Sequence, residues 1–61
     1  MMKWNEKLRK LRGEKTIEEV TEATNLNPNI YSEYEAGNRI PLPQVKEIIC
    51  GYFKVNVSDI W

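Results

Sequence analysis

Neither a disulfide bridge nor a structural zinc site is expected to stabilise this chain, because it contains one cysteine, Cys50, and no histidine. A chain of 61 residues buries only about 60% of the surface that its unfolded form exposes, so its stability is marginal. The stabilising options that remain are close helix packing or self-association. We therefore expect residues 1–61 to form one domain, with Cys50 as a small buried residue.

No segment is expected to cross or enter a membrane. The sequence has no apolar run of about 18 residues, and its first residues lack the apolar stretch of a signal peptide. We therefore expect a cytoplasmic protein without a membrane partner.

Local signals divide the chain into five short helices, and no segment alternates with the period of a strand over strand length. The first helix is predicted from Lys3 to Arg12 and ends at Gly13, a residue type that commonly follows a helix in the left-handed conformation. The second begins at Thr16, which has capping-box spacing to Glu19. Asn25 is a plausible left-handed turn residue after it.

The later helices have equally local start signals. Asn27 followed by Pro28 gives the clearest one, because Asn accepts from the first free amides and proline at the first helical position loses no needed donor. Gly37 is predicted to end this third helix. The fourth runs from Pro43 to about Phe53, and the fifth is a single turn over Val57–Trp61.

Apolar residues at helical spacing predict the core. The buried stripe of the second helix is predicted as Ile17, Val20 and Ala23. Tyr31 and Tyr34 share a face of the third helix, and we interpret them as core residues rather than as surfaces on which bases stack. The other predicted core positions are Trp4, Leu8 and Leu11 in the first helix and Val45, Ile48, Ile49, Tyr52 and Phe53 in the fourth.

The second and third helices are separated by about three residues, the spacing of a helix-turn-helix, whose second helix can enter a major groove. A more specific signal follows in residues 31–41, which read Tyr-Ser-Glu-Tyr-Glu-Ala-Gly-Asn-Arg-Ile-Pro. This stretch resembles the end of the recognition helix and the next loop in the lambda-repressor-like family, also called Cro-like or xenobiotic-response-element-like. Residues 8–12 and 52–60 resemble other parts of that family, so the resemblance spans nearly the whole chain.

The resemblance implies a compact all-α bundle of five helices, with the helix-turn-helix in helices 2 and 3. It implies a sequence-specific double-stranded-DNA-binding transcriptional regulator of repressor or Cro type, from a bacterium, phage or mobile element. Two copies would form a homodimer that reads half-sites about one helical turn apart. No cofactor and no metal are implied.

Carried over position by position, the resemblance implies eight DNA-binding residues. Their chemistry fits in part, because Asn pairs bidentately with adenine, Ser contacts any base and Ile can touch a thymine methyl group. Arg39 has an alternative role as an ion-pair partner of Glu35, and Trp61 is either a core residue or a dimer anchor. Those on or near the groove-facing side are Asn27, Pro28, Asn29, Ile30, Ser32 and Glu33, and those near phosphates are Asn38 and Arg39.

The charge distribution supports a second hypothesis, a helix-turn-helix fold that binds another protein, as an antirepressor-like or antitoxin-like partner. Residues 1–15 carry six basic side chains and two acidic ones, whereas residues 16–36 carry five glutamates and no basic residue. DNA repels acidic surfaces. In addition, Ile17 stands where the family usually has a glutamine that contacts DNA.

Catalysis is not expected. A serine triad is excluded because Ser32 has no histidine partner anywhere in the chain. The three glutamates of the second helix are expected to be solvated rather than to form an acid/base pair. The chain has three glycines and no phosphate-binding glycine loop.

Overall fold

The computed structural model describes residues 2–61, which form four α-helices followed by one turn of 3-10 helix. Residues 2–61 contain no β-strand, so the predicted all-α class is confirmed. The last predicted helix is shorter than expected, because only Val57–Asp59 is helical there, and it is 3-10 rather than α. The α-helices are α1 (Trp4–Arg12), α2 (Ile17–Thr24), α3 (Pro28–Ala36) and α4 (Pro43–Phe53), and the final turn is η1 (Val57–Asp59).

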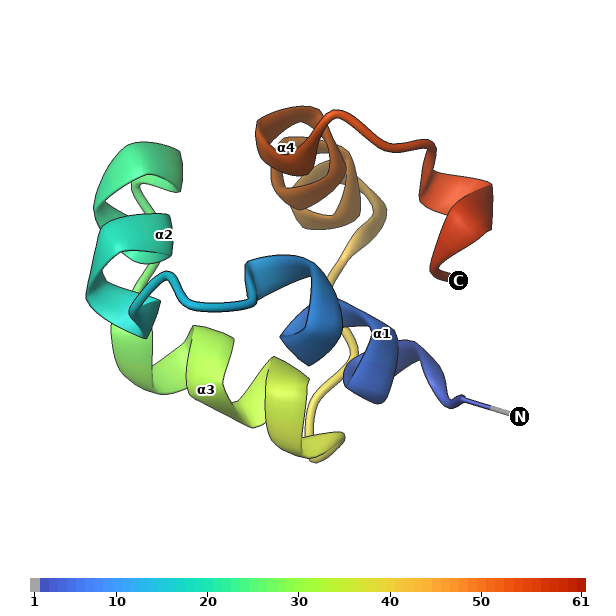
Figure 1. Ribbon diagram of the computed structural model, residues 1–61, viewed down its shortest axis with the longest axis horizontal. Helices are drawn as coiled ribbons and strands as arrows, with labels where there is room; N and C mark the ends of the chain where they lie inside the picture. The colour runs from blue at the N-terminus through green and yellow to red at the C-terminus, as the bar shows by residue number, and fades with distance from the viewer. Residues whose placement is uncertain (1) are drawn as a thin grey trace.

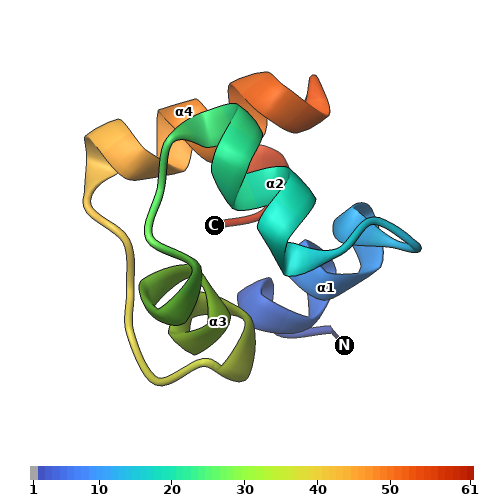
Figure 2. The ribbon, with the colours of Figure 1, turned by 90° about the vertical axis from the view of Figure 1, so that its left-hand side faces the viewer.

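The helices surround one small core in a molecule that measures 28 × 22 × 20 Å. In Figure 1, α2 stands at the left edge, α3 lies along the bottom and α4 is viewed nearly end-on at the top. The C-terminal turn lies on the side opposite α2. Figure 2 shows the connection between α3 and α4 running along one edge of the molecule, while α2 lies on the side nearest the viewer and contacts both α3 and α4.

The starts of α2 and α3 agree with the predicted caps. Thr16 precedes α2, and its hydroxyl accepts a hydrogen bond from the Glu19 backbone N–H at 3.1 Å. Asn27 precedes α3, and its side-chain oxygen accepts from the backbone N–H groups of Asn29 and Ile30 at 2.8 and 3.1 Å. Each cap satisfies amides that the helix itself leaves without a partner.

Three helices end at a residue in the left-handed conformation. Asn25 has φ 60°, as predicted, and Gly37, which was predicted to end α3, has φ 80°. Lys54 ends α4 with φ 59° although lysine rarely adopts this conformation, and nothing in its residue type indicated it. The backbone at Gly37 also lies close to α1, because a Cβ added there would lie 3.1 Å from the Asn5 side chain.

The core is built from all four α-helices and the C-terminal turn. The two core tyrosines and the free cysteine are buried, which confirms the predictions for Tyr31, Tyr34 and Cys50. Burial raises the pKa of the Cys50 thiol, and a raised pKa lowers the fraction of reactive thiolate. The buried core residues are Leu8, Val20, Tyr31, Tyr34, Ile49, Cys50 and Ile60.

The predicted buried face of α2 is partly wrong. Val20 is fully buried, but Ala23 is exposed, and the buried positions beside Val20 are Thr21 and Thr24. Threonine is tolerated there because each hydroxyl donates to a carbonyl one turn earlier in the same helix. Thr21 bonds the Ile17 oxygen at 2.9 Å and Thr24 bonds the Val20 oxygen at 2.7 Å. In α4, Ile48 is likewise outside the core, with 46% of its surface exposed.

An ion pair that is mostly buried joins α1 to α3. Arg12 donates from Nε to Glu35 Oε2 at 2.7 Å and from Nη2 to Glu35 Oε1 at 2.9 Å. The Glu35 side chain is only 4% exposed. Arg12 also donates to the Lys15 backbone oxygen, at 2.6 Å, so one side chain holds α1, the following turn and α3 together. The hydrogen bond to Glu35 raises the pKa of Arg12, which keeps the guanidinium charged.

Trp61 packs against the core beside the start of α1. Its ring centroid lies 5.8 Å from that of Trp4, and the Lys46 Nζ lies 5.3 Å from the Trp61 centroid. The Trp61 indole N–H is buried and has no hydrogen-bond partner within residues 2–61. Trp61 therefore has the core contacts predicted for it, while a role in dimer formation stays a prediction.

Candidate nucleic-acid interface

Helix α3 has one face in the core and the other toward solvent. Tyr31, Tyr34 and Glu35 are buried, and the rings of the two tyrosines meet edge to face with centroids 6.2 Å apart. Residues three and four apart share a helix face, so Asn29, Ser32 and Glu33 lie together on the other side. Asn29 and Ser32 are exposed, and Glu33 is partly exposed. The core contacts thus fix the orientation in which these polar groups are presented.

Two asparagine side chains at the start of α3, Asn27 and Asn29, differ in which of their hydrogen-bonding groups are available to a ligand. The Asn27 side-chain oxygen is occupied by the two backbone amides that it caps, which leaves its NH₂ group as the available donor. The Asn29 side chain forms no hydrogen bond within residues 2–61, so both its donor and its acceptor are available to a ligand. Pro28 is exposed between them, while Ile30 is half-buried and packs against the core.

Arg39 forms an ion pair with Glu33, and the predicted alternative pairing with Glu35 is wrong. The Arg39 Nε lies 2.9 Å from Glu33 Oε2. Glu35 is unavailable to Arg39 because it is buried and already bound by Arg12. The side chains of Arg39 and Glu33 are 54% and 45% exposed, so this is a surface pair of the kind that contributes little to stability. Arg39 can therefore exchange Glu33 for another anion at low cost.

The connection after α3 places two further predicted residues at the surface. Asn38 and Arg39 are both exposed in the segment between α3 and α4. The start of α4 follows closely, with Pro43 at its first position and no side-chain cap from Leu42. The amides of an uncapped first turn carry partial positive charge, which favours a nearby phosphate. The structure thus brings all eight predicted DNA-binding residues into α3 and its two flanking segments.

The surface next to the first turn of α3 is acidic. Glu18 and Glu22 of α2 line a hollow of about 330 Å³ that Pro28 also borders. The basic side chains of α1 belong to a different helix, and of these Arg12 is committed to Glu35. The predicted charge asymmetry is therefore also a spatial one at the start of α3, where Pro28 adjoins two carboxylates of α2.

The residues that hold α3 in place were not found from the sequence. Arg12 and Glu35 are 23 positions apart, and no local pattern links them. Asn5 is a second such residue, because its side-chain NH₂ donates to the Glu35 backbone oxygen at 3.2 Å. The one available signal was a glutamate, Glu35, that directly follows a core tyrosine on α3.

Residues 2–61 hold no cluster of three or more histidine, cysteine, aspartate or glutamate side chains that could bind a metal ion. None of the helices in this part of the chain is long and apolar enough to cross a membrane. Comparison of the chain with protein-family models, with curated proteins and with solved structures found no match.

Proposed function

We propose that this protein is a sequence-specific double-stranded-DNA-binding transcriptional regulator, with α2 and α3 acting as a helix-turn-helix and α3 as the recognition helix. The connection of Asn25–Asn27 between the two helices has the length that such a motif requires. The proposal includes a compact bundle of lambda-repressor-like type, a homodimer and a cytoplasmic location. It includes no catalytic activity and no cofactor.

The observation that carries the proposal is the solvent-facing side of α3. Asn29 and Ser32 are exposed there without hydrogen-bond partners inside residues 2–61, and such groups are able to read base edges in a major groove. On the opposite side, buried tyrosines hold the helix rigidly. A fixed helix with free amide and hydroxyl groups on its outer face is what direct readout needs.

A binding selection on randomised DNA duplexes at low salt tests this function. Enrichment of a palindromic or repeated motif with half-sites about 10 base pairs apart is the result that we expect of a dimeric reader. The affinity for the enriched site should fall steeply as salt rises, because bound phosphates release counterions. The absence of any enriched motif, with helical folding intact by circular dichroism, would contradict the proposal.

Asn29→Ala is expected to weaken binding to the selected site by about 1–3 kcal/mol and to relax the preference at one base position. The reason is that a free, exposed amide is able to pair bidentately with adenine. Competition binding on a panel of single-base variants of the site measures both effects. Asn25→Ala and Asn56→Ala are poor controls, because Asn25 has a left-handed backbone and Asn56 caps η1 together with Asp59. Ser58→Ala changes an exposed polar residue outside α2 and α3 and should leave DNA binding unchanged.

Arg39→Ala is expected to weaken binding to all sequences alike and to reduce the slope of log affinity against log salt by about 1. Arg39 would leave Glu33 for a phosphate, so its loss removes one ionic contact without a base preference. Because the pair with Glu33 is half-exposed, the free energy of unfolding should change by less than about 1 kcal/mol. An unchanged salt slope would show that Arg39 does not contact a phosphate.

The second candidate function is a protein-binding module with the same fold. The observation that favours it is the acidic surface of α2 beside α3, where two glutamates line the hollow that Pro28 borders. A module of this kind would have no measurable affinity for DNA even at low salt. The salt titration therefore separates the two functions, because only the DNA-binding protein gives a measurable and decreasing affinity.

A further inference from the structure

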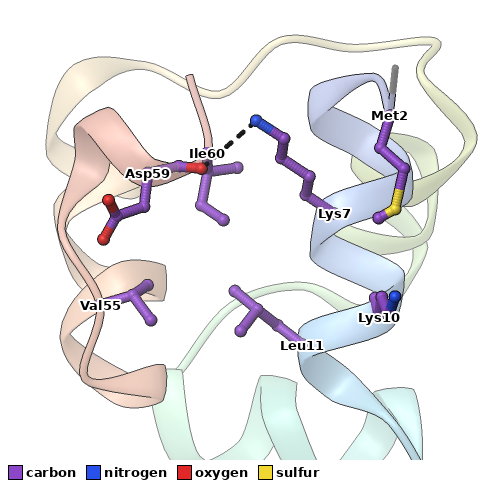
Figure 3. A pocket seen from close by; sticks show the side chains of 7 residues that line it. All are labelled: Met2, Lys7, Lys10, Leu11, Val55, Asp59 and Ile60. Atoms are coloured by element: carbon purple, nitrogen blue, oxygen red, sulfur yellow. Dashed lines mark hydrogen bonds between the residues drawn. The ribbon is translucent and has the colours of Figure 1, made fainter.

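A hollow of about 280 Å³ lies between α1 and the C-terminal segment, far along the chain from the polar face of α3. Figure 3 shows the side chains of Leu11, Val55 and Ile60 converging from its opposite walls. Met2 lies at its edge, and Lys7, Lys10 and Asp59 complete the lining. Mostly apolar walls with a few polar groups are typical of small-molecule sites, and the volume is near the lower end of their range, at about 300 Å³.

The lysine at the mouth of this hollow has no anionic partner. Lys7 is half-buried and reaches from α1 to the C-terminal segment, where its Nζ donates to the Asp59 backbone oxygen at 3.4 Å. That carbonyl is neutral and the contact is long. The Asp59 carboxylate accepts instead from the Asn56 backbone N–H at 3.1 Å, and Figure 3 shows it pointing away from the hollow.

The charge balance around the hollow is therefore positive. Neither Lys7 nor Lys10 forms an ion pair with any residue in 2–61. The Lys7 Nζ makes only an exposed contact, and an ammonium group forms a shorter and stronger hydrogen bond with an anion than with a neutral carbonyl. A carboxylate at the mouth would replace the long contact to Asp59 as the acceptor.

We propose that this hollow binds a small carboxylate that carries an apolar chain or ring. Its apolar part lies against Leu11, Val55 and Ile60, and its carboxylate accepts from Lys7 and Lys10. At about 30 Å³ for each water-sized group, the hollow has room for roughly nine or ten such groups, which sets the size of the ligand. None of the lining residues belongs to α3, so this site goes beyond the proposed DNA binding and its test requires no DNA.

Octanoate is the probe, because its size matches the hollow and its charge matches the lysines. Titration of the ¹⁵N-labelled protein, followed by amide chemical shifts, should give saturating changes at Leu11, Val55 and Ile60. Octanamide has the same chain without the charge and should bind about tenfold more weakly. Acetate has the charge without the chain and should leave these amides unshifted at the same concentration.

Single-charge variants test the lysines. Lys7→Gln and Lys10→Gln should each weaken octanoate binding several-fold, while Arg9→Gln, an exposed change of equal charge on the same helix outside the lining, should leave it unchanged. Circular dichroism checks that each variant is folded, and the probe series on the unmodified chain stands independently of the variants.

Several results would overturn the assignment. Equal binding of octanoate and octanamide would leave an apolar hollow without preference for carboxylates. Equal shifts from acetate, or equal weakening by Arg9→Gln, would mean unspecific attraction to a basic helix. Shifts with an acidic, amphipathic peptide but none with octanoate would make this a protein-binding surface instead. Each of these results leaves the outcome of the DNA selection unaffected.

Discussion

Replacement of Arg12 by methionine is expected to lower the free energy of unfolding by about 3–5 kcal/mol. A domain of 61 residues has roughly 3–9 kcal/mol in total, so this single replacement would remove a large part of its stability. The cause is Glu35, whose side chain is 4% exposed and whose two oxygens both accept from Arg12. Without the guanidinium, α3 would carry an uncompensated charge against the core. Urea denaturation followed by far-UV circular dichroism measures the change.

The double variant Arg12→Met with Glu35→Met separates charge burial from packing. Replacing both members of a buried pair by apolar side chains is often nearly neutral, so the double variant should be at least about 2 kcal/mol more stable than Arg12→Met alone. The exposed pair of Arg39 and Glu33 is the matched control, and Arg39→Met should cost less than about 1 kcal/mol. Equal costs for Arg12→Met and Arg39→Met would show that burial of Glu35 has no energetic consequence.

Tyr31→Ala is expected to lower the free energy of unfolding by about 3–5 kcal/mol, because it removes a fully buried ring from a core of few residues. The ring lies between α3 and the rest of the core and meets Tyr34 edge to face. The cavity left behind would also loosen the helix that presents Asn29 and Ser32. Thermal unfolding by calorimetry gives the cost, and a change below about 1 kcal/mol would contradict the central position of this ring.

Tyr31→Phe is the control for that variant. It also tests the alkaline pH dependence of stability that the Tyr31 hydroxyl gives to the unmodified protein. The Tyr31 hydroxyl is buried and has no hydrogen-bond partner within residues 2–61, so phenylalanine should cost less than about 1 kcal/mol. Burial, and then the nearby Glu35 charge, raise the pKa of Tyr31 well above its ordinary value. The folded state therefore holds the phenolic proton more tightly than the unfolded chain does.

The sign of the resulting pH dependence follows from proton linkage. The stabilisation is complete below about pH 10, the ordinary pKa of tyrosine, and is lost as pH rises above it, because the unfolded chain then releases the proton first. Between about pH 9 and pH 11, the unmodified protein should lose about 1 kcal/mol more stability than Tyr31→Phe. Parallel curves for the two proteins would contradict this role of the hydroxyl.

The parts of the fold that the sequence predicted are the ones set by local chemistry. The Asn27 cap with Pro28 after it, and the left-handed residues Asn25 and Gly37, depend only on near neighbours in the chain. The buried tyrosines of α3 followed from helical spacing alone. The resemblance to the lambda-repressor-like family implied that Asn29 and Ser32 lie on the outer face of the third helix, and both side chains are exposed in the structure.

The errors concern side chains whose environment is decided by distant or unexpected partners. Thr21 lies outside the predicted buried stripe, which contained only apolar residues, yet it is buried because the helix backbone satisfies its hydroxyl. Glu35 was predicted as an alternative ion-pair partner of Arg39, whereas in the structure the packing of α1 on α3 pairs Glu35 with Arg12. No periodicity encodes a pair 23 positions apart, and the same holds for the hollow between α1 and the C-terminal segment.

The contact between Trp4 and Trp61 has a consequence for the newly made chain. The two rings stack 5.8 Å apart although about 57 residues separate them, and Lys7 also reaches Asp59. At a synthesis rate of about 5–20 residues per second, the start of α1 waits about 3–11 s for these partners. During that interval Trp4 has no ring to pack against, so the packing of α1 on the core is completed only after residues 59–61 have been made.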